Sequence, residues 1–127
     1  MSDNYRTCQC ISCDLDYFTG PAYTDELLCQ DCAFSLEGLR KLVVYWSKRT
    51  PAINRQLATT HAMKLLEEAN EFKDDPSNVV ELADVFIAWC VNACWHDHNI
   101  MQAIREKMAV NFTRDWHVGD NGVTRHV

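Results

Sequence analysis

Five acidic side chains are spaced so that they could hold a divalent metal ion. Glu67, Glu68 and Glu71 form an EExxE pattern, and Glu81 and Asp84 form an ExxD pattern further along the chain. Successive residues of an α-helix turn by about 100°, so each pattern gathers its carboxylates on one helix face. Carboxylate oxygens are the ligands that Mg²⁺ and Mn²⁺ prefer, and these ions neutralise phosphate charge during hydrolysis. The patterns therefore predict a Mg²⁺-dependent or Mn²⁺-dependent site for a phosphorylated substrate.

The helices that must position these carboxylates follow from the apolar periodicity of the chain. We predict four helices, over about residues 35–50, 59–74, 78–95 and 100–116. The third is apolar almost all round, which is typical of the central helix of a bundle. The residues after Trp116 contain two glycines and no helical period, so we expect an extended, surface-docked end.

Packing the second and third helices against each other about Pro76 sets the carboxylates in facing pairs. Glu71 and Glu81 are each five residues from Pro76. Glu68 and Asp84 are each eight residues from it. Carboxylates held together in an apolar bundle repel one another, so a cation must offset them or they must take up protons. These four residues are the predicted metal ligands.

Four cysteines near the N-terminus have the spacing of a zinc site. Cys10-x₂-Cys13 and Cys29-x₂-Cys32 are separated by fifteen residues, and each pair can supply two thiolates to a tetrahedral ion. The segment has too few apolar residues for a core of its own, so metal binding would supply its folding free energy. Four thiolates leave no open position for water, which predicts structural zinc. Cys8 is a spare thiol or a competing ligand.

Composition limits the architecture and the partners. The chain has 127 residues, of which 47% are hydrophobic and 24% charged, so we expect one helical core with a small extra module. Residues 1–34 carry six acids and one base, and such a module would be repelled by a phosphate backbone. We expect no nucleic acid binding, no membrane insertion and no secretion signal, hence a cytoplasmic protein.

The acidic patterns resemble those of the MazG-like all-α nucleoside triphosphate pyrophosphohydrolases, in which EExxE is followed by ExxD. The ending GDNGVTRHV is similar to the close of the phage subgroup that acts on dATP and dGTP, which includes MazZ-type enzymes. The resemblance covers about residues 35–127. It implies an all-α fold, a four-helix MazG-like bundle, to which residues 1–34 add a zinc ribbon.

The resemblance also implies an activity and an assembly. The expected reaction is hydrolysis of dGTP or dATP between the α and β phosphates, giving the monophosphate and pyrophosphate. The expected assembly is a homodimer or homotetramer, in the host cytoplasm if the protein is phage-encoded. The implied catalytic residues are Glu67, Glu68, Glu71, Glu81 and Asp84, with Glu67 the least certain ligand and a candidate to accept the proton of water. Lys107, Asn111 and Arg114 have the spacing of one helix face and would hold phosphate.

Two alternatives remain open at this point. An HD-type phosphohydrolase would release triphosphate and would take its metal ligands from His61, His96, Asp97 and Asp120. A non-enzymatic zinc-ribbon adaptor would use the helical bundle as a dimerisation or partner-binding platform. Alanine at Glu68 or Asp84 would leave the function of such an adaptor intact.

Overall fold

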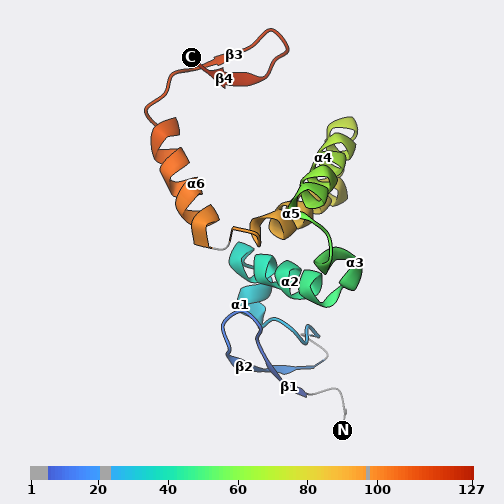
Figure 1. The fold of residues 1–127 in the computed structure, drawn as a ribbon. Helices are drawn as coiled ribbons and strands as arrows, with labels where there is room; N and C mark the ends of the chain where they lie inside the picture. Colours follow the sequence, from blue (N-terminus) through green and yellow to red (C-terminus); the bar gives the residue numbers. More distant parts are fainter. Residues whose placement is uncertain (1–5, 21–23, 97) are drawn as a thin grey trace. The chain divides into compact units, whose positions relative to one another are not determined.

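The computed structural model describes residues 6–20, 24–96 and 98–127, which fall into two compact units (Figure 1). The first unit spans residues 1–95 and the second residues 96–127. The predicted zinc-ribbon module of residues 1–34 lies within the first unit. No described helix has both the length and the apolar character needed to cross a membrane.

The structure contains the four long helices that were predicted. The elements of the first unit are β1 (Arg6–Gln9), β2 (Asp16–Thr19), α1 (Gln30–Ala33), α2 (Leu36–Arg49), α3 (Pro51–Asn54), α4 (Ala58–Asp74) and α5 (Val79–Ala93). Those of the second are α6 (His98–Asn111), β3 (Trp116–Val118) and β4 (Thr124–His126). The short helices α1 and α3 and the C-terminal hairpin were not predicted.

The N-terminal segment folds as a small antiparallel hairpin followed by α1. Strand β1 pairs with β2, with Cys8 opposite Tyr17. The core of this segment consists of Cys10, Leu28 and Cys29, all of them buried. Two of these three residues are predicted zinc ligands, so the metal site and the core of the ribbon are one structure.

The larger part of the first unit is built from α2, α4 and α5. Helix α4 packs along α5, and α2 packs against α5. Side chains cap two of these helices: the Ser35 hydroxyl accepts a hydrogen bond from the Gly38 amide (2.9 Å), and Asn78 Oδ1 accepts one from the Val80 amide (3.0 Å). Pro51 starts the short helix α3, where its missing N–H is not needed.

Helix α5 is buried along only part of its length. Its buried residues are Ala88, Cys90, Val91 and Ala93, all in its second half, where Val43 of α2 joins the core. In the first half, Val79 is 74% exposed and Val80 63%. The prediction of a central helix that is buried on all sides therefore holds, in the single chain, only for the second half of α5.

The fourth helix ends earlier than predicted. Helix α6 stops at Asn111 rather than near Trp116. The Thr113 hydroxyl donates to the Val110 carbonyl (2.7 Å), and the Trp116 indole donates to the Asn111 carbonyl (3.2 Å). These side-chain bonds satisfy the last helical carbonyls and end the helix. Arg114 consequently lies in the turn after α6. The prediction that it shares one helix face with Lys107 and Asn111 is wrong.

The C-terminal residues form a hairpin rather than the extended end that we expected. Strands β3 and β4 pair antiparallel, with Trp116 opposite His126. Gly122 turns the chain with a φ of 80°, a conformation that glycine adopts without strain. Asn121 Oδ1 accepts from the Val123 amide (3.2 Å) and completes the turn. Val118 pairs with Thr124, so residues 119–123 form the loop, and a glycine in the left-handed conformation is typical of hairpin loops of this length.

Candidate metal and nucleotide site

The structure brings three of the predicted metal ligands into one cluster. Oxygens of Glu68, Glu81 and Asp84 all lie within 4.8 Å of one another. Glu68 projects from α4, whereas Glu81 and Asp84 project from α5, so the cluster exists because the two helices fold back at the turn near Pro76. Glu68 is only 8% exposed. We refer to these three residues as the carboxylate cluster.

Lys64 is the basic residue that the structure places beside this cluster. Its ammonium lies 2.8 Å from Glu68 Oε1 and 3.7 Å from Glu67 Oε2. The hydrogen bond from Lys64 lowers the pKa of Glu68, although burial acts in the opposite direction. The same contact raises the pKa of Lys64. One ammonium cannot balance several carboxylates, so the site keeps a net negative charge.

The other two predicted acids lie at the margin of the cluster. Glu71 is exposed, and its pKa is raised by its hydrogen bond to Glu68, by the charge of Glu68, by burial and by the charge of Glu81. Glu67 is exposed and lines a pocket beside the cluster. Glu68 thus meets both Glu81 and Asp84 across the turn, and the charge of Glu81 also acts on Glu71.

The donor set of the cluster fits a hard divalent cation. Glu68 Oε2 and Glu81 Oε2 are buried and have no hydrogen-bond partner among the described residues. Buried acceptors without a partner are uncommon and destabilising. Oxygen ligands on several carboxylates suit Mg²⁺ or Mn²⁺, so a cation would satisfy both atoms.

A pocket of about 520 Å³ lies beside the carboxylate cluster. Its acidic side includes Glu67, Glu68 and Asp84. Its apolar walls include Trp46, Ile53, Ile87, Ala88 and Val91. The size and the mixture of apolar walls with a few polar groups are typical of small-molecule sites.

Several residues of this pocket were not singled out for it from the sequence. Trp46 and Gln56 lie outside both acidic patterns. His61 entered only through the HD-type alternative. Lys64 stands four residues before Glu68, so helical periodicity places the two side chains next to each other. This spacing is the sequence feature that indicates the contact. The others come together because α2, α3, α4 and α5 converge.

The predicted phosphate-binding residues belong to the second unit. Lys107 and Asn111 lie on α6, whereas Arg114 follows it. Asn111 Oδ1 is buried without a hydrogen-bond partner among the described residues. The role of these three residues stays a prediction.

The candidate ligands of the HD-type alternative are divided between the two units. His61 is buried on α4 and lies beside Trp95, with ring centroids 5.9 Å apart. His96 and Asp120 belong to the second unit, and Asp97 lies outside the described residues. In the described ranges, the groups of side chains able to hold a metal are the carboxylate cluster and four cysteines, and neither contains a histidine.

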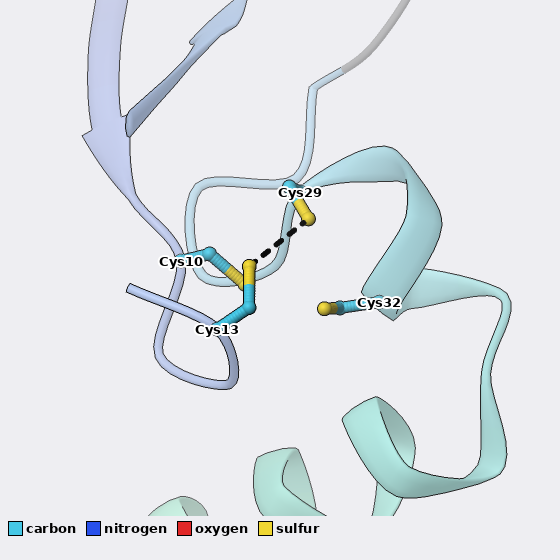
Figure 2. Close-up of side chains that lie close together, drawn as sticks. All are labelled: Cys10, Cys13, Cys29 and Cys32. Atoms are coloured by element: carbon cyan, nitrogen blue, oxygen red, sulfur yellow. Dashed lines mark hydrogen bonds between the residues drawn. The ribbon is translucent and has the colours of Figure 1, made fainter. Parts of the chain in front are cut away.

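The four cysteines of the ribbon point toward a common centre (Figure 2). The Sγ atoms of Cys10, Cys13, Cys29 and Cys32 all lie within 4.8 Å of one another. Those of Cys13 and Cys29 are 3.8 Å apart. A tetrahedral ion with Zn–S bonds of about 2.3 Å requires S···S separations of about 3.8 Å, whereas a disulfide requires about 2.05 Å. The arrangement therefore fits four thiolates around one zinc ion.

The thiols of this group have unequal acidities. Burial opposes ionisation of Cys10, but hydrogen bonds from the backbone at Cys29, Cys13 and Ser12 lower its pKa to about 6. A side-chain hydrogen bond from Ser12 favours ionisation of Cys32, but burial and the three other cysteines raise its pKa to about 12. Four thiolates thus repel one another strongly without a cation, which again fits zinc.

The ribbon is attached closely to α2. The Lys41 ammonium donates to the carbonyl of Ser12 (2.9 Å), which lies between two of the cysteines. The Ser35 hydroxyl donates to the Cys32 carbonyl (3.1 Å). A Cβ atom at Gly38 would overlap the same carbonyl, so the absence of a side chain at position 38 allows this approach.

Comparison with known proteins gives three findings that agree. A family model described as dATP/dGTP pyrophosphohydrolase matches residues 32–127, which leaves most of the ribbon outside it. A dATP/dGTP diphosphohydrolase of cyanophage S-2L is 39% identical over 66 residues, which span 50% of this chain and 63% of that relative.

The third finding is structural. The solved structure of a cyanophage S-2L MazG-like pyrophosphohydrolase, bound to dGDP and three catalytic Mn²⁺ ions per active site, is similar with a TM-score of 0.61 and 30% identity. The similarity covers 73% of this chain and 97% of that chain. The resemblance inferred from the two acidic patterns is confirmed.

Proposed function

Because this chain belongs to the dATP/dGTP pyrophosphohydrolase family, we propose that it hydrolyses dATP or dGTP between the α and β phosphates, releasing the monophosphate and pyrophosphate. The observation that carries the proposal is the carboxylate cluster at one side of a nucleotide-sized pocket. The cyanophage relative with a similar fold binds dGDP and Mn²⁺, which supports the same substrate class.

The carboxylates would have two roles, metal binding and acceptance of a proton, according to their positions. We propose that Glu68, Glu81 and Asp84 hold Mg²⁺ or Mn²⁺, with Glu71 at the edge of the metal site. When bound, the ions supply charge neutralisation on the phosphates and make the attacking water more acidic. Glu71 and Glu67 are the carboxylates left to accept the proton of that water. The pKa of Glu71 is raised by its hydrogen bond to Glu68, which suits it to accept a proton.

Basic side chains would bind the phosphates. Lys64 already contacts two acids of the site, so it can turn to a phosphate oxygen once a metal ion takes its place beside Glu68. We propose Lys107, Asn111 and Arg114 as further phosphate ligands, on the family resemblance alone.

We propose a structural zinc ion at Cys10, Cys13, Cys29 and Cys32. The Sγ separations and the contacts of the ribbon with α2 support this role. No open coordination position would remain for chemistry, so the ion would hold the ribbon and, through it, the start of α2.

A homodimer or homotetramer is proposed as the assembly. Helices α4 and α5 expose large apolar side chains, among them Leu66, Val79 and Val80. Exposed large apolar side chains on neighbouring helices would be covered in an interface between copies of the chain. Light scattering after gel filtration measures the assembly, and a monomeric mass would contradict it. If the protein is phage-encoded, it would act in the host cytoplasm.

One experiment tests the reaction and the substrate together. The purified protein is incubated with each dNTP and NTP in Mg²⁺ or Mn²⁺, and pyrophosphate and nucleotide products are quantified. We expect pyrophosphate and dGMP or dAMP from the purine deoxynucleotides. Release of triphosphate would support the HD-type alternative, and no hydrolysis of any nucleotide would support the adaptor.

A further inference from the structure

His61 is a buried polar side chain that the proposed hydrolysis does not use. It is 5% exposed and lines the same pocket as the carboxylate cluster. Its position on α4 is three residues before Lys64 and seven before Glu68, which places the three on one face of the helix. Within the described residues, its imidazole lies beside Trp95, and the hydrogen bonds of His61 are made by its backbone amide and carbonyl rather than by the ring.

The backbone at His61 is held in place from α5. Asn92 Nδ2 donates to the His61 carbonyl (2.9 Å) and to the Ala88 carbonyl (2.8 Å). These bonds join the first turn of α4 to α5 beside the pocket. The backbone of His61 is therefore fixed where its side chain lines the pocket. A residue that contacts a ligand specifically needs such support.

An imidazole carries at least one N–H donor in either protonation state. Within the described residues the ring makes no hydrogen bond, and its nitrogens are not fully buried where His61 lines the pocket. The ring can therefore donate to an acceptor on a molecule in the pocket. Around it, Trp46, Ile53 and Val91 provide apolar surface for the faces of an aromatic ring. The combination indicates a heteroaromatic ligand with an acceptor on its edge.

The purine N7 atom is such an acceptor. Adenine and guanine both present N7 as an acceptor, whereas their neighbouring groups differ: N6 is a donor and O6 an acceptor. Pyrimidines have no atom equivalent to N7. A single donor aimed at N7 would thus admit both purines and disfavour both pyrimidines.

We propose that the His61 imidazole donates a hydrogen bond to N7 of the purine base and is a specificity-determining residue of this pocket. The inference rests on the proposed function, because it assumes that a nucleotide occupies the pocket. Two helical turns, about 10 Å, separate His61 from Glu68 along α4. This separation leaves room for a deoxyribose between the base and the phosphates at the carboxylate cluster.

The test compares dGTP with 7-deaza-dGTP, in which a C–H group replaces N7. For the wild-type protein we expect kcat/KM to be at least about tenfold lower with the deaza substrate, mainly through KM, because the His61 donor then faces a carbon. For His61→Leu we expect a lower kcat/KM with dGTP and a ratio near one between the two substrates. His61→Asn keeps an N–H donor and should restore part of the discrimination.

The control variant is Gln56→Leu, which changes a polar residue of the same pocket. It should keep the wild-type ratio between dGTP and 7-deaza-dGTP, whatever it does to the absolute rate. Equal rates of the wild-type protein on the two substrates would overturn the role of His61. This comparison uses no variant, so it does not depend on whether a variant folds. Failure of the proposed function is distinct, because the wild-type protein would then hydrolyse neither substrate.

Discussion

Replacing Asp84 with asparagine should stabilise the metal-free protein while abolishing its activity. Asp84 shares a 4.8 Å cluster with two other carboxylates. Two unit charges at that separation repel each other by about 3.5 kcal/mol at an effective dielectric constant of about 20. The Lys64 ammonium offsets part of this repulsion, so we expect a net gain of about 1–2 kcal/mol. The asparagine amide can also donate to the unpartnered oxygens of Glu68 and Glu81.

The measurement combines thermal unfolding with product assays. In EDTA, a gain of this size should raise the Tm of Asp84→Asn by about 3–6 °C. Added Mn²⁺ should raise the Tm of the wild-type protein and have a much smaller effect on the variant, because ligand binding stabilises only the state that binds. Pyrophosphate release from dGTP should fall by at least about a hundredfold, since a proposed metal ligand is lost.

The matched control is Asp74→Asn, which removes the same charge from an acid that is 77% exposed at the end of α4. We expect its metal-free Tm, its response to Mn²⁺ and its activity to stay close to those of the wild-type protein. The reasoning would be refuted if Asp84→Asn lowered the metal-free Tm, or if it kept both the response to Mn²⁺ and the rate of hydrolysis.

Three further outcomes follow from contacts of the first unit. Gly38→Ala should lower the free energy of unfolding by about 2 kcal/mol, because the new Cβ overlaps the Cys32 carbonyl; denaturant titration and a colorimetric zinc assay would reveal it, and an unchanged stability would contradict the close packing of ribbon and α2. Lys64→Met should raise the pKa of Glu68. In the wild-type protein, the lowered pKa of Glu68 stabilises the fold at pH values above the pKa of the unfolded chain, and this stabilisation is lost as the pH falls. Metal-free unfolding measured between pH 3 and 7 should therefore show a smaller acid-induced loss in Lys64→Met than in the wild-type protein, and an equal loss would exclude the ion pair. Trp46→Ala should raise KM for dGTP about tenfold if the indole stacks on the base, and steady-state kinetics with unchanged KM would exclude stacking.

The carboxylate cluster was largely predictable because it depends on two local rules. Helical periodicity places the acids of each pattern on one face, and the short turn at Pro76 brings the two faces together. The meeting of the four cysteines was predictable for a similar reason, since the two C-x-x-C pairs bring two thiols each to one place.

Errors occurred where side chains compete with the backbone over a few residues. Thr113 and Trp116 end α6 before the predicted boundary. The turn at Asn121-Gly122 makes a hairpin of the tail. Both signals were present in the sequence, but each depends on a single hydrogen-bonding side chain or a single left-handed residue rather than on a repeated pattern.

By itself, the sequence determined the types, spacing and helix faces of the residues that can bind metal, because periodicity and cysteine spacing are local properties. Only the tertiary structure decided which carboxylates meet, that Lys64 lies beside them, and that Trp46, Gln56 and His61 share a pocket with them. These residues come from α2, from α4 and from the segment that follows α3. A pocket wall depends on how helices distant in sequence pack, and no local pattern records that packing.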